Sequence, residues 1–455
     1  METAQKIYPI LNDLLDEKFI TDKQHEYLSP HYAPINPRYF YLLPKIHKKQ
    51  SAWPTPLCPP GRPIVADVDT ESSRICAYID FYLKPLSILH PSYIKDTYDF
   101  VKKIRNKPVP HDSLLITADV ESLYTNMKLD LILKSIYETF LEHPDPYRPD
   151  IHLLELLKLT LYYNDFHFDN QFFLQICGIA MGRRYAPSSA NIYLKKFDDL
   201  ATHTPLINPL LYFRFLDDIF GVWPGTVAQL KEYEAHLNTL IPGIKVTFSY
   251  NNYTIEFLDT FIYKHTHKNG LTTLQTKVHF KPTDTHQLLH RSSFHPRHTF
   301  NSVIKSQFIR FKRISSTYSQ YSFTSSILIH SLIARGYNKT LLRQQKLKIW
   351  REYKEPPTSR KEQQKYTEII PIITHFDRHN LRLNQKWASI IRENPIFQKQ
   401  QKNPISPLRI ISAYKKHKNL RNILTKNQFQ DPDTPEHLLD TLIILMELTA
   451  PPPTD

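Results

Sequence analysis

The sequence is poor in glycine and cysteine, with 8 glycines and 3 cysteines among 455 residues. So little glycine excludes a collagen-like or glycine-linker chain, and no GxGxxG turn for a dinucleotide is present. Cys58, Cys76 and Cys177 are odd in number and lack CxxC spacing. We therefore expect neither a disulfide framework nor a structural zinc site, which fits a reducing compartment.

Long apolar runs are also missing. No stretch approaches the ~20 apolar residues that cross a bilayer. The first residues, METAQKIYPILNDLLDEKF, carry acidic charge and lack the apolar core of a signal peptide. We therefore expect an intracellular protein with no membrane partner.

Positive charge is abundant. The 58 Lys and Arg residues exceed the 44 Asp and Glu residues and give a net charge of +14. This balance favours a polyanionic partner such as nucleic acid. At roughly 150 residues per domain, the length predicts about three domains.

The apolar pattern changes between helical and strand periods, which predicts a mixed α+β fold. The run LLITA at 114–118 is typical of a buried strand. The segment YFRFLDDIFGVW at 212–223 is typical of two strands joined by a tight turn, and 244–263 predicts further strands. The expected helices cover 5–28, 70–90, 128–164, 187–201, 226–240 and much of the chain from about 285 to a disordered tail.

Three aspartates lie where these predicted strands end. Asp119 follows the run LLITA, and Asp217 and Asp218 occupy the turn of FRFLDDIF. Adjacent carboxylates among large apolar residues leave uncompensated charge unless cations bind. Nucleotidyl transfer needs two hard divalent cations held by such oxygens. The pattern therefore predicts a polymerase site, with a helix cap at Asp119 and an ordinary hairpin turn as structural alternatives.

A second aspartate pair, Asp198 and Asp199 in KKFDDL, is not predicted to bind metal. Apolar residues from Ala190 to Ala201 recur at helical spacing. We therefore expect both carboxylates on the solvated face of a helix.

The segment GIAMGRRYAPSSANIYL at 178–194 lies between the two carboxylate motifs. It holds Gly178 and Gly182, two of the eight glycines, within five residues. Glycine permits positive φ and a close approach of another molecule to the backbone. The segment predicts a platform for a base pair or template nucleotide, with a plain strand-to-helix turn as the alternative.

Together these motifs resemble the reverse transcriptase of Penelope-like retroelements, a eukaryotic family related to telomerase reverse transcriptase. The combination LPKIHK, DVxSLYTN and AMGxxxAPxxAN is narrower than a lone aspartate pair, and the matches follow family order along nearly the whole chain. The matching stretches are FYLLPKIHKK (40–49), GRPIVADVDTESSRICAYIDFYLKPL (61–86), LLITADVESLYTNM (114–127), GIAMGRRYAPSSANIYL (178–194), YFRFLDDIF (212–220), IEFLDTFIY (255–263), HFKPTDTHQLLHRSSFHP (279–296), SQFIRFKRISS (306–316) and KKHKNLRNILTK (415–426).

The resemblance implies a right-hand polymerase with fingers, an antiparallel-sheet palm and a helical thumb. The implied reaction adds dNTPs to a DNA primer 3′ end on an RNA template with two Mg²⁺ ions, for which Mn²⁺ is a substitute. The expected parts are a helical lead-in over 1–38, fingers and palm over 39–265, a thumb over 266–345 and a basic helical C-terminal extension over 346–455.

The resemblance also implies roles around the metals. Asp119, Asp217 and Asp218 are the implied metal ligands, and the Val120 carbonyl is a further one. Tyr124 is implied to pack under the sugar and exclude a 2′-hydroxyl, which favours dNTPs. A core aromatic at the strand end is the structural alternative for Tyr124.

Further positions are implied to bind the incoming nucleotide. Arg62, with Lys45 or Lys48, would hold the triphosphate, because a guanidinium binds phosphate in bidentate fashion. Solvated lysines of a basic loop and, for Lys245, an edge-strand lysine are the alternatives to these roles. The implied set comprises Lys45, Lys48 and Arg62 as finger cations, Met181 and Gly182 as the platform, and Lys245 as a general acid near the pyrophosphate.

Two basic segments predict nucleic-acid contacts. In SQFIRFKRISS, Arg310, Lys312 and Arg313 alternate with apolar residues, as in an amphipathic helix. In a thumb this helix would follow primer–template phosphates, and a helix-turn-helix-like module gives the same pattern. Lys415 and Lys416 begin a second cluster, which predicts a phosphate-binding face or a merely soluble helix. The histidines over 279–298 lack metal-ligand spacing and predict a polar loop.

The sequence departs from the family at its end. Members commonly continue into a Cys-containing linker and a GIY-YIG endonuclease, whereas this chain stops within about thirty residues of KKHKNLRNILTK. We therefore expect extension of a pre-existing DNA 3′ end in the nucleus, or a truncated gene. The alternatives are a decayed or domesticated copy that binds nucleic acid without catalysis, and an RNA-dependent RNA polymerase, against which Tyr124 argues.

Overall fold

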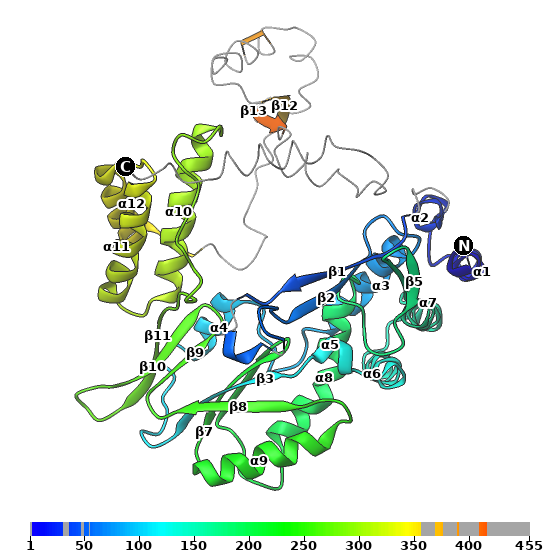
Figure 1. Ribbon diagram of the computed structural model, residues 1–455, viewed down its shortest axis with the longest axis horizontal. Coiled ribbons are helices and arrows are strands. Elements are labelled where there is room, and N and C mark those ends of the chain that lie inside the picture. Colours follow the sequence, from blue (N-terminus) through cyan, green and yellow to red (C-terminus); the bar gives the residue numbers. More distant parts are fainter. Residues whose placement is uncertain are drawn as a thin grey trace. The chain divides into compact units, whose positions relative to one another are not determined.

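Helices and strands are interspersed along the chain in a mixed α+β fold with antiparallel sheets (Figure 1). The structure, a computed structural model, describes residues 2–30, 36–46, 50–53, 55–355, 369–375, 389–390 and 409–415. The chain divides into two units. The first comprises residues 1–288 and 304–353, and the second comprises 289–303 and 354–455.

The elements of the first unit refine the predicted boundaries. Its helices are α1 (Glu2–Asp16), α2 (Asp22–Leu28), the 3₁₀ turn η2 (Gln50–Ala52), α3 (Ser73–Leu86), α4 (Thr97–Ile104), α5 (Leu123–Asn126), α6 (Leu129–Glu142), α7 (Asp150–Tyr162), α8 (Ala186–Thr202), α9 (Val227–Leu240), α11 (Tyr318–Ala334) and α12 (Lys339–Glu352). Its strands are β1 (Tyr39–Pro44), β2 (Gly61–Ala66), β3 (Leu114–Val120), β4 (Asp165–Phe168), β5 (Gln171–Leu174), β6 (Leu211–Phe215), β7 (Asp218–Trp223), β8 (Val246–Asn251), β9 (Thr254–Phe257), β10 (Thr260–Thr266) and β11 (Thr272–Val278). Helix α10 (Arg297–Ile314) begins in the second unit and ends in the first.

A four-stranded antiparallel sheet in the order β6-β7-β3-β8 lies at the centre of the first unit. Successive side chains of a strand point to opposite faces. Ile116 and Ala118 of β3 therefore join the large apolar core that also holds residues of α3, α6, α7, α8 and α9. Leu115, on the other face, joins Phe220 and residues of α4 and β9 to β11. Burial on both faces explains why LLITA is a continuous apolar run.

A second four-stranded sheet, in the order β2-β1-β4-β5, is formed by segments that flank β3 in sequence. Strands β1 and β2 pair antiparallel from Tyr39↔Ala66 to Pro44↔Gly61. Strand β1 also meets β4, which forms a hairpin with β5. We refer to this sheet as the finger sheet, because it carries Arg62, one of the residues that the resemblance assigned to the fingers.

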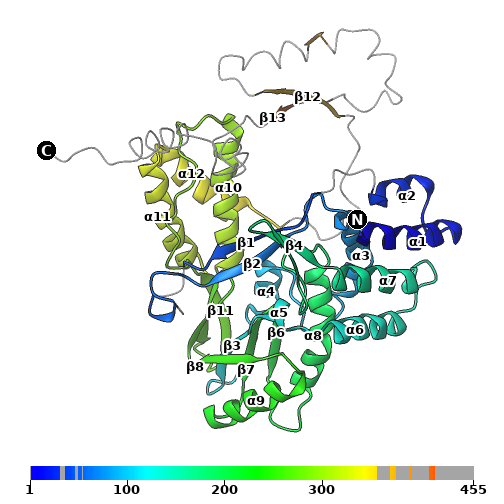
Figure 2. The same ribbon diagram turned by 45° about the vertical axis from the view of Figure 1, so that its right-hand side comes forward.

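Three helices follow the small antiparallel sheet β11-β10-β9 (Figure 2). The Tyr321 ring of α11 stacks on the Trp350 ring of α12 with 4.9 Å between centroids. Thr276 of β11 donates its hydroxyl to the Ile314 carbonyl at 2.5 Å, which ties the end of α10 to the sheet. The predicted helical thumb over 266–345 was therefore wrong in its first part, where residues 272–278 are a strand.

The second unit differs from the predicted helical extension where the structure describes it. Strands β12 (Ile369–His375) and β13 (Arg409–Lys415) pair in parallel, so the prediction of helix is wrong for these two segments. β-branched isoleucines in both strands favour this conformation. Among the residues that the structure describes, no helix is long and apolar enough to cross a membrane.

Candidate active site

Two of the three predicted aspartates are direct partners across the central sheet. Asp119, near the end of β3, pairs in register with Asp218, the first residue of β7. Asp217 precedes it in the turn from β6, and the Asp217 carbonyl accepts a hydrogen bond from the Val120 amide at 2.9 Å. Two carboxylates distant in sequence are therefore brought to one sheet face, with a third beside them.

The local sequence explains this turn. Leu216 has φ 55°, the left-handed conformation that bulky residues rarely adopt, and it lets β6 reverse tightly into β7. Because side chains alternate, Asp218 and Phe220 share a face of β7, and Asp119 lies on the same sheet face. Asp119 and Asp218 line an open cavity of about 320 Å³.

The site concentrates negative charge. Burial, followed by the charges of Asp217 and Asp119, raises the pKa of Asp218 from 3.8 to about 6. Lys281 opposes that rise. Within the described part of the chain, no three His, Cys, Asp or Glu side chains form a ready-made metal cluster. The donor chemistry nevertheless fits hard divalent cations, because carboxylate oxygens are their preferred ligands and the charges of Asp119 and Asp217 act on Asp218.

Sequence reasoning missed the positive side of this cavity. His279 and Lys281, just after β11, line it together with Glu256 and the two paired aspartates. His279 Nδ1 lies 3.5 Å from the Glu256 carboxylate, and its amide donates to a backbone carbonyl of the β9–β10 turn. The segment HFKPTDT was recognised only as a family match. Its position near Asp218 depends on the path of strands β9 to β11, which the spacing of residues in the sequence does not predict.

Residues 178–182 form a loop, which we call the glycine loop. Its backbone packs closely against the backbone of two other segments, at Tyr124 and at Val65. The Ile179 amide donates to the Tyr124 carbonyl at 2.7 Å, and a Cβ on Gly178, whose φ is +71°, would lie 2.2 Å from that oxygen. A Cβ on Gly182 would lie 1.9 Å from the Val65 carbonyl of β2. Close approach of the protein's own backbone therefore explains glycine at these two positions, and the platform for a base pair or template nucleotide stays a prediction.

Tyr124 lies between this loop and the aspartates. Burial, with the nearby charge of Asp217, raises the pKa of Tyr124 to about 12, and the charge of Arg62 partly opposes this. Arg62 is exposed on β2. Arg62 of the finger sheet and Asp217 thus both act electrostatically on Tyr124. Met181 is half-buried in the loop, and its carbonyl accepts a hydrogen bond from the Val65 amide at 3.1 Å.

The remaining predicted nucleotide-binding lysines have varied surroundings. Lys45 follows β1, and its amide donates to the Pro60 carbonyl at 2.8 Å. Lys245 directly precedes β8, at the edge of the central sheet, and its ammonium donates to the Asn238 carbonyl of α9 at 2.6 Å. Lys48 and Lys416 lie outside the described residues, and Lys415 is exposed at the end of β13.

The three predicted thumb cations all make contacts within the protein. The Lys312 ammonium donates to the Trp350 and Tyr353 carbonyls at 2.7 and 2.6 Å, at the end of α12. The Arg313 guanidinium lies 3.5 Å from the ring centroid of Tyr98. Arg310 pairs with a carboxylate of the β9–β10 turn. These cations hold α10 in place, and their binding to nucleic acid stays a prediction.

The prediction for Asp198 and Asp199 was half wrong. Both lie on helix α8, as expected, but Asp198 is completely buried while Asp199 is exposed. The reason is Arg214, a buried partner whose guanidinium lies 2.7 Å from the Asp198 carboxylate. Neither aspartate lies in the cavity lined by Asp119 and Asp218.

Comparisons with known proteins show only limited similarity. The family model of the animal helix-turn-helix domain matches residues 287–346, which include α10 and α11. No curated protein matches the chain. A structure of telomerase from Candida albicans with a telomeric RNA fragment has 14% identity and a TM-score of 0.47, over 67% of this chain and 57% of that one.

Two viral RNA-dependent RNA polymerases also have similar structures. That of a human picobirnavirus has 9% identity and a TM-score of 0.44, over 69% of this chain and 58% of its own. The Sicinivirus polymerase has 13% identity and a TM-score of 0.43, over 77% and 71%. The chain thus spans less than two thirds of the telomerase and picobirnavirus chains. None of these structures assigns it to a family.

Proposed function

We propose that this protein is an RNA-directed DNA polymerase of the Penelope-like type, which extends a DNA 3′ end with dNTPs. The observation that carries the proposal is the register pair of Asp119 and Asp218, with Asp217 in the adjoining turn. Three carboxylates at the end of a buried strand and a neighbouring hairpin are the arrangement that the motifs predicted. A surface that only binds a polyanion has no use for such a concentration of negative charge.

The aspartates would bind the metal ions. Asp119, Asp217 and Asp218 would hold two Mg²⁺ ions, which when bound would lower the pKa of the attacking 3′-hydroxyl and stabilise the leaving phosphates. At pH 8 the Asp218 carboxyl, with its pKa of about 6, is ionised and available as a ligand. Lys281, which lines the same cavity, would attract a phosphate of the primer strand.

Arg62 and Tyr124 would orient the nucleotide. The Arg62 guanidinium, exposed on β2, would bind the triphosphate through its planar fork. The Tyr124 ring would lie under the sugar, where a 2′-hydroxyl has no room. Because the pKa of Tyr124 is about 12, its hydroxyl stays neutral over the working pH range. Exclusion of ribonucleotides distinguishes this proposal from an RNA-dependent RNA polymerase.

Primer extension on poly(rA)/oligo(dT) with Mg²⁺ tests the proposal. We expect Asp217→Asn to lower the extension rate by about a thousandfold or more, since several kcal/mol of charge stabilisation is lost. The matched control is Asp112→Asn, because the Asp112 side chain is fully exposed just before β3. If the wild-type protein binds the duplex but does not extend it with any divalent ion, the result would instead support the binding-only alternative.

A further inference from the structure

A buried arginine lies directly behind the catalytic turn. Arg214 belongs to β6 and is 2% exposed, and its partner Asp198 on α8 is completely buried. The Arg214 Nη2 lies 2.7 Å from Asp198 Oδ2, and its Nε lies 2.9 Å from both carboxylate oxygens. This is a bidentate pair with full desolvation, so its orientation is tightly fixed.

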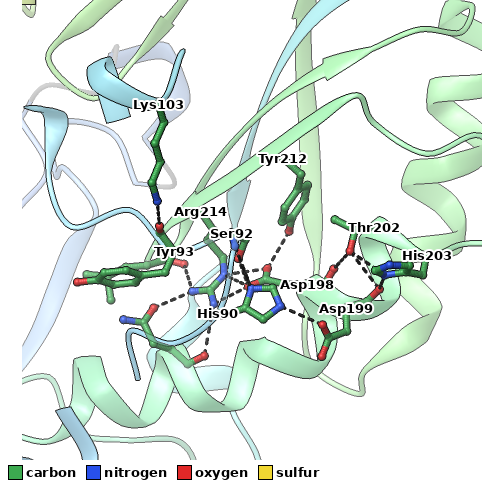
Figure 3. A network of polar contacts seen from close by, with 12 residues as sticks. His90, Ser92, Tyr93, Lys103, Asp198, Asp199, Thr202, His203, Tyr212 and Arg214 are labelled. Carbon is green, nitrogen blue, oxygen red and sulfur yellow. Dashed lines mark hydrogen bonds and ion pairs between the residues drawn. The ribbon is translucent and has the colours of Figure 1, made fainter. Parts of the chain in front are cut away.

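Asp198 is held in turn by several donors (Figure 3). The Ser92 and Tyr212 hydroxyls donate to its carboxylate at 2.7 and 2.9 Å. His90 Nδ1 lies 3.5 Å from Asp198, while its Nε2 lies 3.0 Å from Asp199. Three side chains from two segments, Ser92 of the loop before α4 and Tyr212 and Arg214 of β6, thus donate hydrogen bonds to one carboxylate, which makes Asp198 a fixed reference point within the first unit.

The free end of the guanidinium reaches the turn itself. Arg214 Nη1 donates to the Leu216 carbonyl at 3.0 Å and to Asn191 Oδ1 at 2.8 Å. Leu216 is the residue with φ 55° that starts the reversal into Asp217 and Asp218. On its other side the turn is bound through the Asp217 carbonyl and the Val120 amide.

We propose that Arg214 is a positioning residue for the catalytic turn. It fixes the strained Leu216 peptide relative to Asp198, so that Asp217 and Asp218 present their carboxylates beside Asp119. A bulky residue adopts positive φ only when its surroundings impose it. Arginine is required because three separate acceptors, the carboxylate, the amide and the carbonyl, match its planar set of N–H donors. This role rests on the proposed polymerase function.

The informative variant is Arg214→Lys, which keeps the positive charge beside Asp198 but cannot reach all three acceptors. We expect its primer–template dissociation constant to stay within about twofold of wild type. The extension rate per active site, measured from the pre-steady-state burst, should fall about tenfold to a hundredfold, as for a small misplacement of reacting groups. Hydrogen exchange of residues 211–223 in the metal-free protein should become faster.

Arg148→Lys is the matched control. Arg148 is likewise buried, pairs with Asp150 and donates to the Phe140 and His143 carbonyls, but it joins α6 to α7 away from the aspartates. This control should lose stability at most and keep the wild-type rate per active site. A merely structural role of Arg214 predicts the same behaviour for both variants.

The outcomes separate the two proposals. If wild type never extends a primer, the polymerase function fails, while faster exchange confined to the turn still supports the bracing by Arg214. An Arg214→Lys protein with wild-type burst rate and exchange overturns the inference. If that variant does not fold, the charge-free double variant Arg214→Gln/Asp198→Asn replaces it. A folded double variant with the wild-type rate per site also overturns the inference, and a reduced rate supports it.

Discussion

Arg310 on α10 forms an ion pair with Asp259 in the β9–β10 turn, with 3.0 Å between Nη2 and Oδ2. Asp259 directly follows Leu258, which lines the cavity of the paired aspartates. The cation that was predicted to contact nucleic acid is thus held near the cavity of the paired aspartates by a carboxylate. Both side chains are partly exposed, so the pair is weak enough to exchange for a phosphate.

Opposite effects are therefore expected from the two halves of this pair. Arg310→Gln should weaken primer–template binding and reduce the slope of log affinity against log salt by about one charge. Asp259→Asn should tighten binding, because it releases Arg310 without removing it. Fluorescence anisotropy over a salt series measures both. Equal affinities for the two variants would show that Arg310 serves only to hold α10.

The backbone contacts of Gly182 predict a strong effect of one methyl group. In Gly182→Ala the new Cβ would lie 1.9 Å from the Val65 carbonyl, so the loop or β2 must move. We expect a loss of about 2 kcal/mol or more in the free energy of unfolding and at least about tenfold in extension rate.

Gly270→Ala is the control for this substitution. Gly270 has φ +81° but nothing within 4 Å of its Cβ position, so only backbone strain of about 1 kcal/mol is added. Urea denaturation compares the two variants. Equal destabilisation would mean that the Val65 contact relaxes without cost.

The raised pKa of Asp218 predicts a stability that depends on pH. Well below pH 3.8 this carboxyl is protonated in both folded and unfolded chains, so it does not affect the free energy of unfolding. As pH rises from 3.8 towards 6, the unfolded chain ionises first, and the folded state loses relative stability. Asp218→Asn should therefore stabilise the metal-free protein by about 1–2 kcal/mol at pH 8 and have almost no effect at about pH 2.5.

Thermal melts in the presence of a chelator measure this difference. Mg²⁺ should raise the melting temperature of wild type more than that of Asp218→Asn, because binding to the folded state is coupled to its stability. A variant that is less stable than wild type at pH 8 would contradict the charge crowding at this site.

Tyr124 predicts sugar selectivity through its ring. Tyr124→Ala should raise rNTP incorporation relative to dNTP incorporation by about tenfold or more, whereas Tyr124→Phe should leave the ratio unchanged. The hydroxyl is neutral below its pKa of about 12, so the wild-type ratio should not vary between pH 7 and 9. Single-nucleotide insertion with each sugar gives the ratio, and an unchanged ratio in the alanine variant removes this role.

Sequence alone predicted the parts of the fold that have strong local signals. The run before Asp119 is continuous because both sheet faces are covered, and the turn at Asp217 is bounded by aromatic and β-branched residues. The two glycines between them predicted a special backbone loop, but the structure shows that their close contacts are with the Tyr124 and Val65 carbonyls of the same chain. Each of these signals lies within a few residues of the feature that it predicts.

Partners that are distant in sequence could not be predicted in this way. Helical spacing placed Asp198 on α8 but not its face, because burial of a carboxylate depends on Arg214 from another element. Likewise, the sequence predicted Lys312 as a surface cation, whereas its ammonium donates to carbonyls at the end of α12. Lys281 lies in the same cavity as the aspartates because it follows β11 of a separate sheet, and the sequence does not predict the position of that sheet. The surroundings of a charged side chain therefore cannot be predicted until its partner in the fold is known.

The three thiols of the chain differ in their exposure. Cys76 is buried, whereas Cys58 and Cys177 are exposed. Cys177 also lines a cavity of about 370 Å³ with Phe40 of the finger sheet and Met181 of the glycine loop. After Cys58→Ser, a maleimide dye would therefore attach at one accessible sulfur, and its emission would report in real time on what enters the gap between finger sheet and loop.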